Sequence, residues 1–214
     1  MKAYVITIKD NPRSVEMADR CIESFKRHNP DGEIEVFDAI TPDKDAFSLA
    51  EYYKIPIANF HEKYSRYERV VAAFMSHYML WRKSIFLNKP IVIFEHDAVV
   101  TDAIRKMPFN GLVNLGAPSY GNFNTPNLGL GKLTSKRYLP GAHAYAINPK
   151  GAQVICEAAI MDAGPTDVFL NTRLFPWLEE YYPWPAKADD TFTTIQNKVG
   201  CVAKHNYGSD YEII

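Results

Sequence analysis

The chain has 214 residues, with 24 Lys and Arg against 25 Asp and Glu and 47% hydrophobic residues. This composition is typical of a folded globular protein and excludes disorder as the main state. The net charge of -1 gives no strong signal for nucleic-acid binding, which usually requires a basic face. The three cysteines are far apart and form no C-x-x-C pair, so the sequence suggests neither a disulfide framework nor a zinc site.

The sequence contains no candidate membrane span. No stretch approaches the roughly 20 apolar residues that a span needs, and the apolar run near the start is short and followed by charge. We therefore expect no membrane span and no cleaved leader, and we expect a cytoplasmic protein.

The first 40 residues predict a strand, a helix and a second strand. Residues 3–8 form an apolar run, and apolar residues then recur three and four positions apart. Asn11 before Pro12 fits a helix start, and the turn-forming residues 29–32 end the helix before a strand at 34–40. A βαβ unit of this kind favours parallel strands.

The middle of the chain holds its most apolar elements. Residues 41–66 are weakly patterned and predict a long connection with short helical turns. Residues 67–87 are apolar around much of a helical circumference, which indicates a deeply buried helix. The apolar run at 90–94 is typical of a central parallel strand covered on both faces.

The second half is less regular, with no internal repeat and no clear linker. A loop rich in Gly, Pro and Asn is too long for a simple connection, so we expect it to be functional. The expected elements are a strand at 112–115, this loop at 116–138, a strand at 143–147, a helix from Pro149, a mixed segment at 166–178 and a final strand at 199–203.

An acidic pair follows the buried strand at 90–94. Glu95 and Asp97 stand where this strand ends, and ligands of open α/β sheets bind beyond the carboxyl ends of strands. Two carboxylates two positions apart can converge on one Mg²⁺ or Mn²⁺ ion. The alternative, favoured by pattern alone, is a solvated strand end whose charges only stop the strand.

Blocks spread over most of the chain match one known pattern. Residues 72–83 (A-A-F-M-S-H-Y-M-L-W-R-K) precede residues 91–98 (I-V-I-F-E-H-D-A), and residues 5–14, 37–40 and 141–152 supply further blocks in the same order. Together they resemble glycosyltransferase family 25, whose helix reads G-C-x-x-S-H-x-x-x-W and whose strand ends in L-E-D-D-A. The chain departs from that pattern at His96, in place of the middle acid, and at Ala72-Ala73 or Ala73-Phe74, in place of G-C.

The resemblance implies a fold and an activity. The fold is α/β and GT-A-like (Rossmann-like), with a mostly parallel sheet flanked by helices in a single domain, 1–214. The donor-binding half covers about 1–115 and the acceptor half about 116–214. The activity is a metal-dependent, inverting transfer of a sugar, galactose or another hexose, from a nucleotide-diphosphate sugar such as a UDP-sugar to an acceptor hydroxyl. The acceptor expected is a glycan such as lipopolysaccharide, with a protein hydroxyl or a modified base as alternatives, and the cofactor is Mn²⁺ or Mg²⁺.

The resemblance also implies roles for individual residues. It assigns catalysis to Asp97 and Asp167, with Asp167 as the base for the acceptor hydroxyl. The residues implied for donor binding are Arg13, Asp38, Glu95 and His96, and those for metal binding are Asp97, Glu95 and His205.

Each of these roles has a plainer alternative. Arg13 could be a solvated residue at a helix start, Asp38 a turn residue and Asp167 a helix N-cap. His205 could be an exposed residue of the tail. His77 lies on the apolar face of its helix, where we expect a buried, hydrogen-bonded histidine and not a ligand.

Two other functions stay open. Because His96 replaces an acid, the chain could be a GT-A-like carbohydrate-binding or interaction module without turnover. It could also be a nucleotidyltransferase, which would use the same acids at the strand end and a divalent ion.

Overall fold

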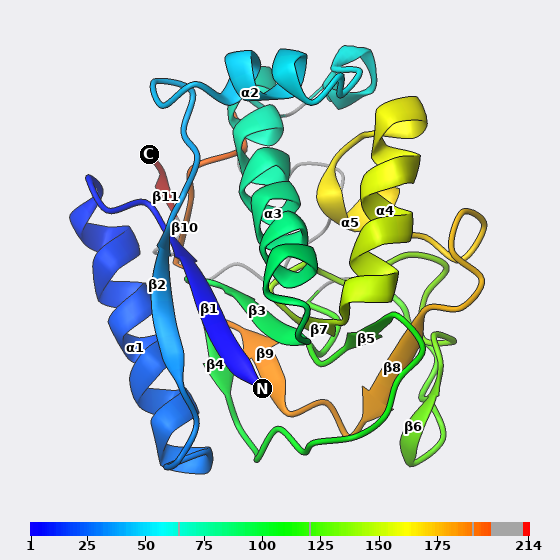
Figure 1. The fold of residues 1–214 in the computed structure, drawn as a ribbon. Coiled ribbons are helices and arrows are strands. Elements are labelled where there is room, and N and C mark those ends of the chain that lie inside the picture. Colours follow the sequence, from blue (N-terminus) through cyan, green and yellow to red (C-terminus); the bar gives the residue numbers. More distant parts are fainter. Residues whose placement is uncertain (64, 120, 190, 198–211) are drawn as a thin grey trace.

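Seven strands form one sheet in the order β2-β1-β3-β7-β5-β8-β6. The computed structural model describes residues 1–63, 65–119, 121–189, 191–197 and 212–214 (Figure 1). The strands of this sheet are β1 (Lys2–Thr7), β2 (Ile34–Asp38), β3 (Ile91–Glu95), β5 (Leu112–Asn114), β6 (Gly129–Lys132), β7 (Ala144–Ile147) and β8 (Glu179–Tyr182).

Most strands of the sheet run in one direction. β1 is parallel to both β2 and β3, and β5 is parallel to β8. β7 is antiparallel to its neighbours β3 and β5, and β6 is antiparallel to β8. Only β7 and β6 therefore run against the other five strands, which confirms the expected mostly parallel sheet.

Helices cover both faces of the sheet. α3 (Tyr67–Leu87) and α4 (Pro149–Asp162) pack on one face, while α1 (Pro12–His28) packs on the other (Figure 1). Side chains alternate between the faces along each strand. In β3, Ile91 and Ile93 therefore join the α3 core, whereas Val92 and Phe94 join the α1 core.

Two helices, α1 and α4, begin where their capping residues predict. The side chain of Asn11 accepts hydrogen bonds from the backbone of Arg13 and Ser14, and Pro12 is the first residue of α1. Asn148 and Pro149 start α4 in the same way. α3 has the predicted bounds, and eleven of its residues are buried, which confirms a deeply buried helix.

Several elements depart from expectation. The loop expected at 116–138 contains β6. Two of the four residues of β6 are glycines, which are unfavourable in strands, so the sequence did not predict it. Two small sheets were also not expected: β4 (Ala98–Val100) pairs with β9 (Ala186–Ala188), and β10 (Phe192–Thr193) pairs with β11 (Glu212–Ile213). Short helices α2 (Ala46–Tyr52) and η1 (Ala58–Phe60) lie in the connection as expected, and α5 (Thr166–Phe169) follows α4. The strand expected at 199–203 lies outside the described residues.

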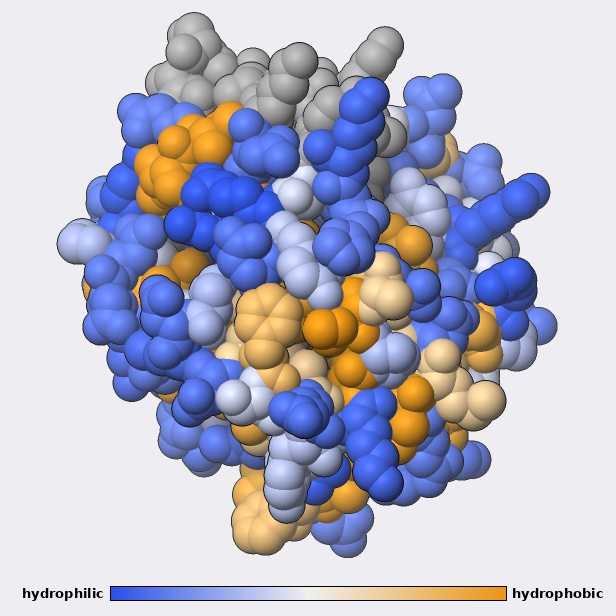
Figure 2. Space-filling view, turned by 90° about the horizontal axis from the view of Figure 1, so that it is seen from above, coloured by the Kyte–Doolittle hydropathy of each residue, from blue (hydrophilic) through white to orange (hydrophobic). Residues whose placement is uncertain are grey.

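Figure 2 views the molecule from the end at which α2 lies in Figure 1. Hydrophilic residues cover much of this face, and apolar residues are exposed near its middle and at its upper left. Within the ranges that the structure describes, no helix has the length and apolar character needed to cross a bilayer.

Candidate active site

A cavity of about 570 Å³ opens at the carboxyl ends of three parallel strands. It is lined by residues that follow β1, such as Ile8 and Asp10, and by Ile40, which follows β2. Glu95 at the end of β3 also lines it, together with one face of the first turns of α3. The volume falls within the range of small-molecule sites, and the position is the usual binding edge of an α/β sheet.

Glu95 faces α3 because it continues the alternation of Ile91 and Ile93 along β3. Its Oε1 lies 3.1 Å from Nε2 of His77. His77 is 1% exposed, and its Nδ1 lies 2.9 Å from the hydroxyl of Tyr145. His77 is therefore a buried histidine with both ring nitrogens hydrogen-bonded, as expected.

The surroundings of Glu95 favour its charged form. Burial acts to raise the pKa of Glu95, but the hydrogen bond and electrostatic attraction from His77 outweigh burial and lower it. Glu95 is therefore an ionised carboxylate near neutral pH, and 35% of its side chain is exposed toward solvent.

His96, which replaces an acid of the motif, points to the opposite face of the strand end. Its Nδ1 lies 2.9 Å from Oγ of Ser14 in α1, and its ring stacks on Phe192 with centroids 5.6 Å apart. Burial lowers the pKa of His96, so the ring is neutral at pH 7. His96 lines the cavity as a neutral hydrogen-bonding group and not as a carboxylate ligand.

Asp97 also lines the cavity, in the turn between β3 and β4. Its backbone carbonyl accepts hydrogen bonds from the amide of Asp189 and from Arg20, which fixes the turn against the segment after β9. The described residues contain no cluster of three or more His, Cys, Asp or Glu side chains that could hold a metal ion. Glu95 and Asp97 would therefore supply two protein ligands at most from this part of the chain.

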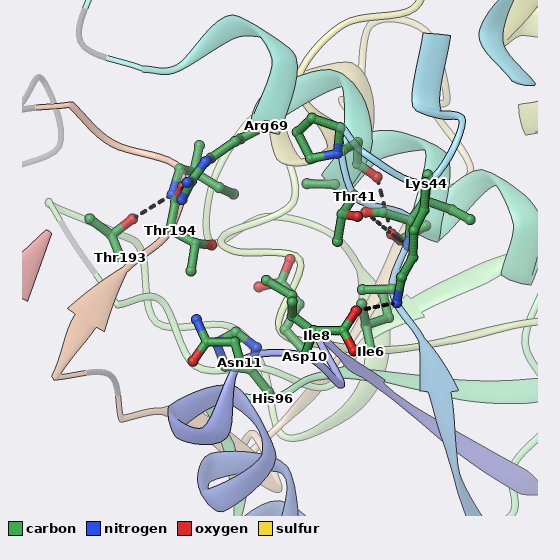
Figure 3. Close-up of a pocket in the computed structure, with 18 of the residues that line it drawn as sticks. Ile6, Ile8, Asp10, Asn11, Thr41, Lys44, Arg69, His96, Thr193 and Thr194 are labelled. Carbon is green, nitrogen blue, oxygen red and sulfur yellow. Dashed lines mark hydrogen bonds and ion pairs between the residues drawn. The ribbon is translucent and has the colours of Figure 1, made fainter. Parts of the chain in front are cut away.

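Two basic residues that sequence reasoning missed line the cavity. Lys44 lies on one side with its Nζ 2.8 Å from Oδ2 of Asp10, and Arg69 lies across from it beside Thr194 (Figure 3). Arg69 donates to the backbone carbonyl of Thr194 at 2.8 Å. Both residues belong to stretches without a recognisable motif, so spacing gave no signal for them.

Other sequence-predicted donor residues lie outside the cavity lining. Arg13 pairs with Glu212, and its guanidinium stacks over the ring of Phe192. Asp38 ends β2 and does not line the cavity. Its Oδ1 lies 3.3 Å from Nζ of Lys44, which does line it. The structure therefore brings together Glu95, His96 and Asp97, but not Arg13 or Asp38.

The remaining predicted site residues are not part of the cavity as described. Asp167 is in α5, where its Oδ1 accepts a hydrogen bond from the amide of Val168 at 2.9 Å. Asp167 therefore makes a local contact in the first turn of α5, as a capping residue would, although the N-cap itself is Pro165. His205 lies outside the described residues.

The fold and the cavity together define an α/β protein with a candidate ligand site at the carboxyl edge of a mixed sheet. The family model for glycosyltransferase family 25 (LPS biosynthesis protein) matches residues 1–112. The chain belongs to glycosyltransferase family 25, which confirms the resemblance of its sequence blocks. The GT-A-like α/β class expected from that resemblance agrees with the observed sheet.

One lipooligosaccharide biosynthesis protein is similar to part of this chain in sequence. A 74-residue segment, 34% of this chain, is 44% identical to lipooligosaccharide biosynthesis protein lic2B of Haemophilus influenzae. The segment spans only 26% of that relative.

Solved glycosyltransferase structures are distant likenesses. Galactosyltransferase LgtC in complex with donor and acceptor sugar analogs has a TM-score of 0.47 at 12% identity, over 88% of this chain and 86% of that chain. GlyE of Streptococcus pneumoniae TIGR4 has a TM-score of 0.45 at 12% identity, over 85% of this chain and 45% of that chain.

Proposed function

We propose that the protein is a metal-dependent, inverting glycosyltransferase whose donor, a UDP-sugar, binds in the cavity at the ends of β1, β2 and β3. The observation that carries the proposal is the pair of carboxylates, Glu95 and Asp97, lining a cavity of nucleotide size at that edge. Family membership supports a sugar nucleotide as the ligand.

The charge of the cavity supports a requirement for a cation. Its described lining carries more carboxylates than basic groups, and a nucleoside diphosphate would add further negative charge. A divalent ion would relieve that repulsion. The carboxylates are Asp10, Asp43, Glu68, Glu95 and Asp97, and the basic residues are Lys44 and Arg69.

The residues present fit a hard divalent ion. Oε1 of Glu95 is engaged by His77, whereas Oε2 makes no hydrogen bond to any residue that the structure describes. Carboxylate oxygens suit Mg²⁺ and Mn²⁺, and such ions commonly take one or two protein carboxylates and complete their shell with phosphate oxygens and water. Glu95 and Asp97 would hold the ion, which when bound supplies Lewis-acid stabilisation of the leaving diphosphate.

The chain's own residues would orient the donor around that point. Lys44 and Arg69, on opposite sides of the cavity, can donate charge-assisted hydrogen bonds to phosphate or ribose oxygens. His96, neutral and held by Ser14, can donate or accept one hydrogen bond at the cavity wall. The apolar walls at Ile8 and Ile40 exclude water from one side of a bound base.

For the transferred group we propose galactose or another hexose, and for the acceptor a hydroxyl of a glycan such as lipopolysaccharide. The description of the family and the lipooligosaccharide biosynthesis relative support this choice. For the acceptor proton we keep Asp167 as the candidate base, which rests on the family resemblance alone.

A donor-hydrolysis assay separates the three candidate activities. With Mn²⁺ present, we expect slow release of UDP from a UDP-hexose. Release of pyrophosphate from a nucleoside triphosphate would instead mark a nucleotidyltransferase, and no turnover with any donor would mark a binding module.

Two aspartates that follow β3 and β4 provide a matched pair of variants for this assay. Asp97→Asn removes a proposed metal ligand and should lower UDP release by at least 100-fold, in the range known for loss of a charge-stabilising group. Asp102→Asn removes the same charge at an exposed position outside the cavity lining and should leave turnover unchanged. Equal activity of the two variants would remove Asp97 from the site.

A further inference from the structure

An unbroken series of hydrogen bonds runs from the hydrophobic core to Glu95. The indole Nε1 of Trp81 lies 2.8 Å from the hydroxyl of Tyr145, and that hydroxyl lies 2.9 Å from Nδ1 of His77. Nε2 of His77 lies 3.1 Å from Oε1 of Glu95. Trp81 and Tyr145 are both 0% exposed and His77 is 1% exposed, so water cannot replace these partners.

The chemistry of the groups fixes the direction of every bond. The indole nitrogen of Trp81 can only donate, so the oxygen of Tyr145 accepts. The single proton of that hydroxyl then has Nδ1 of His77 as its partner, because a buried donor left without one would be costly. With Nδ1 accepting, the ring's proton is on Nε2 and is donated to Glu95.

Three elements of the fold bring these side chains together. His77 and Trp81 are four residues apart in α3 and therefore lie on one face of the helix. Tyr145 in β7 is paired with Ile93 in β3, two residues before Glu95 on the same face of the sheet. The sheet register and the helix face thus set the tyrosine hydroxyl against one nitrogen of His77 and the carboxylate against the other.

We propose that Tyr145, supported by Trp81, is a positioning residue that holds His77 as the Nε2-protonated tautomer, so that His77 fixes the carboxylate of Glu95 toward the cavity. This inference rests on the proposed function, which gives Glu95 its place beside the donor diphosphate. Without the Tyr145 hydroxyl, Nδ1 has no donor. Glu95 alone would then hold the ring, which could rotate and would no longer fix Oε1.

Changing Tyr145 to Phe tests the inference, because it removes one oxygen and retains the ring. We expect hydrolysis of UDP-galactose with Mn²⁺ to lose 10- to 100-fold in kcat, the range typical of partners that orient a metal ligand, with KM for the donor nearly unchanged. The matched control is Tyr78→Phe, which removes another buried hydroxyl from the α3 core but lies outside the series. It should keep the wild-type kcat.

Nitrogen NMR of the histidine rings in metal-free protein gives a readout independent of activity. We expect wild-type His77 to be protonated on Nε2 only, with the Nδ1 resonance shifted by the hydrogen bond from Tyr145, and we expect Tyr145→Phe to lose that shift of Nδ1. A wild-type His77 that carries its proton on Nδ1 would overturn the inference without any variant, even if Tyr145→Phe failed to fold.

The outcomes distinguish the inference from the function on which it rests. If wild-type protein releases UDP and Tyr145→Phe matches it in kcat and in the Nδ1 resonance of His77, the positioning role is wrong and the transferase proposal stands. If wild-type protein acts on no nucleotide sugar, the transferase proposal fails and the catalytic positioning role fails with it. A lower kcat in Tyr145→Phe alone, together with the loss of the Nδ1 shift, supports both.

Discussion

Single side chains explain why the S-H-x-x-x-W pattern in α3 is informative. Ser76 accepts a hydrogen bond from the amide of Ile40 and thereby ties the end of β2 to the helix. His77 binds Glu95, and Trp81 binds Tyr145. The three motif residues thus position two strand ends around the cavity, which a pattern of letters alone could not reveal.

His143 makes the stability of the protein depend on pH. Its Nε2 is buried and has no hydrogen-bond partner among the residues that the structure describes, and a Cβ atom on Gly116 or Gly141 would come within 2.3 Å or 2.7 Å of the ring nitrogens. This burial lowers the pKa of His143 to about 4. The unfolded chain binds the proton near pH 6.5, so the unfolded state takes up more protons between these values.

We therefore expect the free energy of unfolding to fall by up to about 3 kcal/mol as the pH drops from about 6.5 to 4. Urea unfolding at pH 7, 6, 5 and 4 measures this dependence. His143→Phe should flatten the slope in this window, whereas the change of exposed His61 to Phe should preserve it. An identical slope in wild type and His143→Phe would show that His143 is not the group responsible.

Asp167 gives a test of the proposed base. If it removes the proton of the acceptor hydroxyl, Asp167→Asn should lower transfer to an acceptor about 100-fold or more, within the range of general-base catalysis. The melting temperature should change little, because the amide oxygen can still accept from Val168. Full transferase activity of this variant would assign Asp167 to local turn structure only.

The contact between α4 and the loop that leads into β5 depends on a glycine. Gly151 lies in the first turn of α4, where its amide donates to Asn148, and a Cβ atom there would come within 2.4 Å of the carbonyl oxygen of Gly111. A backbone atom cannot rotate away as a side chain can. The helix therefore needs glycine here for close packing and not for its own conformation.

Gly151→Ala should destabilise the protein by about 1 to 3 kcal/mol through overpacking, although alanine is the better helix former by about 1 kcal/mol. Gln153→Ala, at an exposed position in the same helix, should change the free energy of unfolding by no more than about 0.5 kcal/mol. Denaturant unfolding of both variants measures the difference. A more stable Gly151→Ala protein would show that α4 can shift away from the loop.

Elements with strong periodicity could be predicted and those set by distant pairing could not. α3 has the bounds expected from its apolar pattern, and β1, α1 and β2 form the expected unit. By contrast, β4 is three residues long and pairs with β9, far along the chain. Such short strands gain their stability from tertiary contacts and carry little local signal.

The candidate site could be predicted only where its residues lie next to an element with a clear sequence pattern. Glu95 and Asp97 stand beside a strand that the sequence makes plain, so their place at the cavity could be expected. Lys44, Arg69 and Thr194 come from three separate stretches that only the folded chain brings together. Their types and spacing contain no pattern that would have revealed the shared cavity.

The whole fold places an acid-rich cavity at the edge of the sheet where the negatively charged diphosphate of the donor is expected to bind. Three strand ends, the first turns of α3 and residues 192–195 enclose it. Binding of a diphosphate to this cavity should therefore depend on a divalent cation, which is the central claim of the account.

Thermal unfolding with UDP tests that claim most directly. With Mn²⁺ and UDP at about 100 times its Kd, the folded state gains about 2.7 kcal/mol, so the Tm should rise by about 5 to 10 °C. The rise should vanish in EDTA and in Asp97→Asn, and it should persist in Asp102→Asn. An equal rise with UDP in EDTA, or in Asp97→Asn with Mn²⁺, would contradict the account.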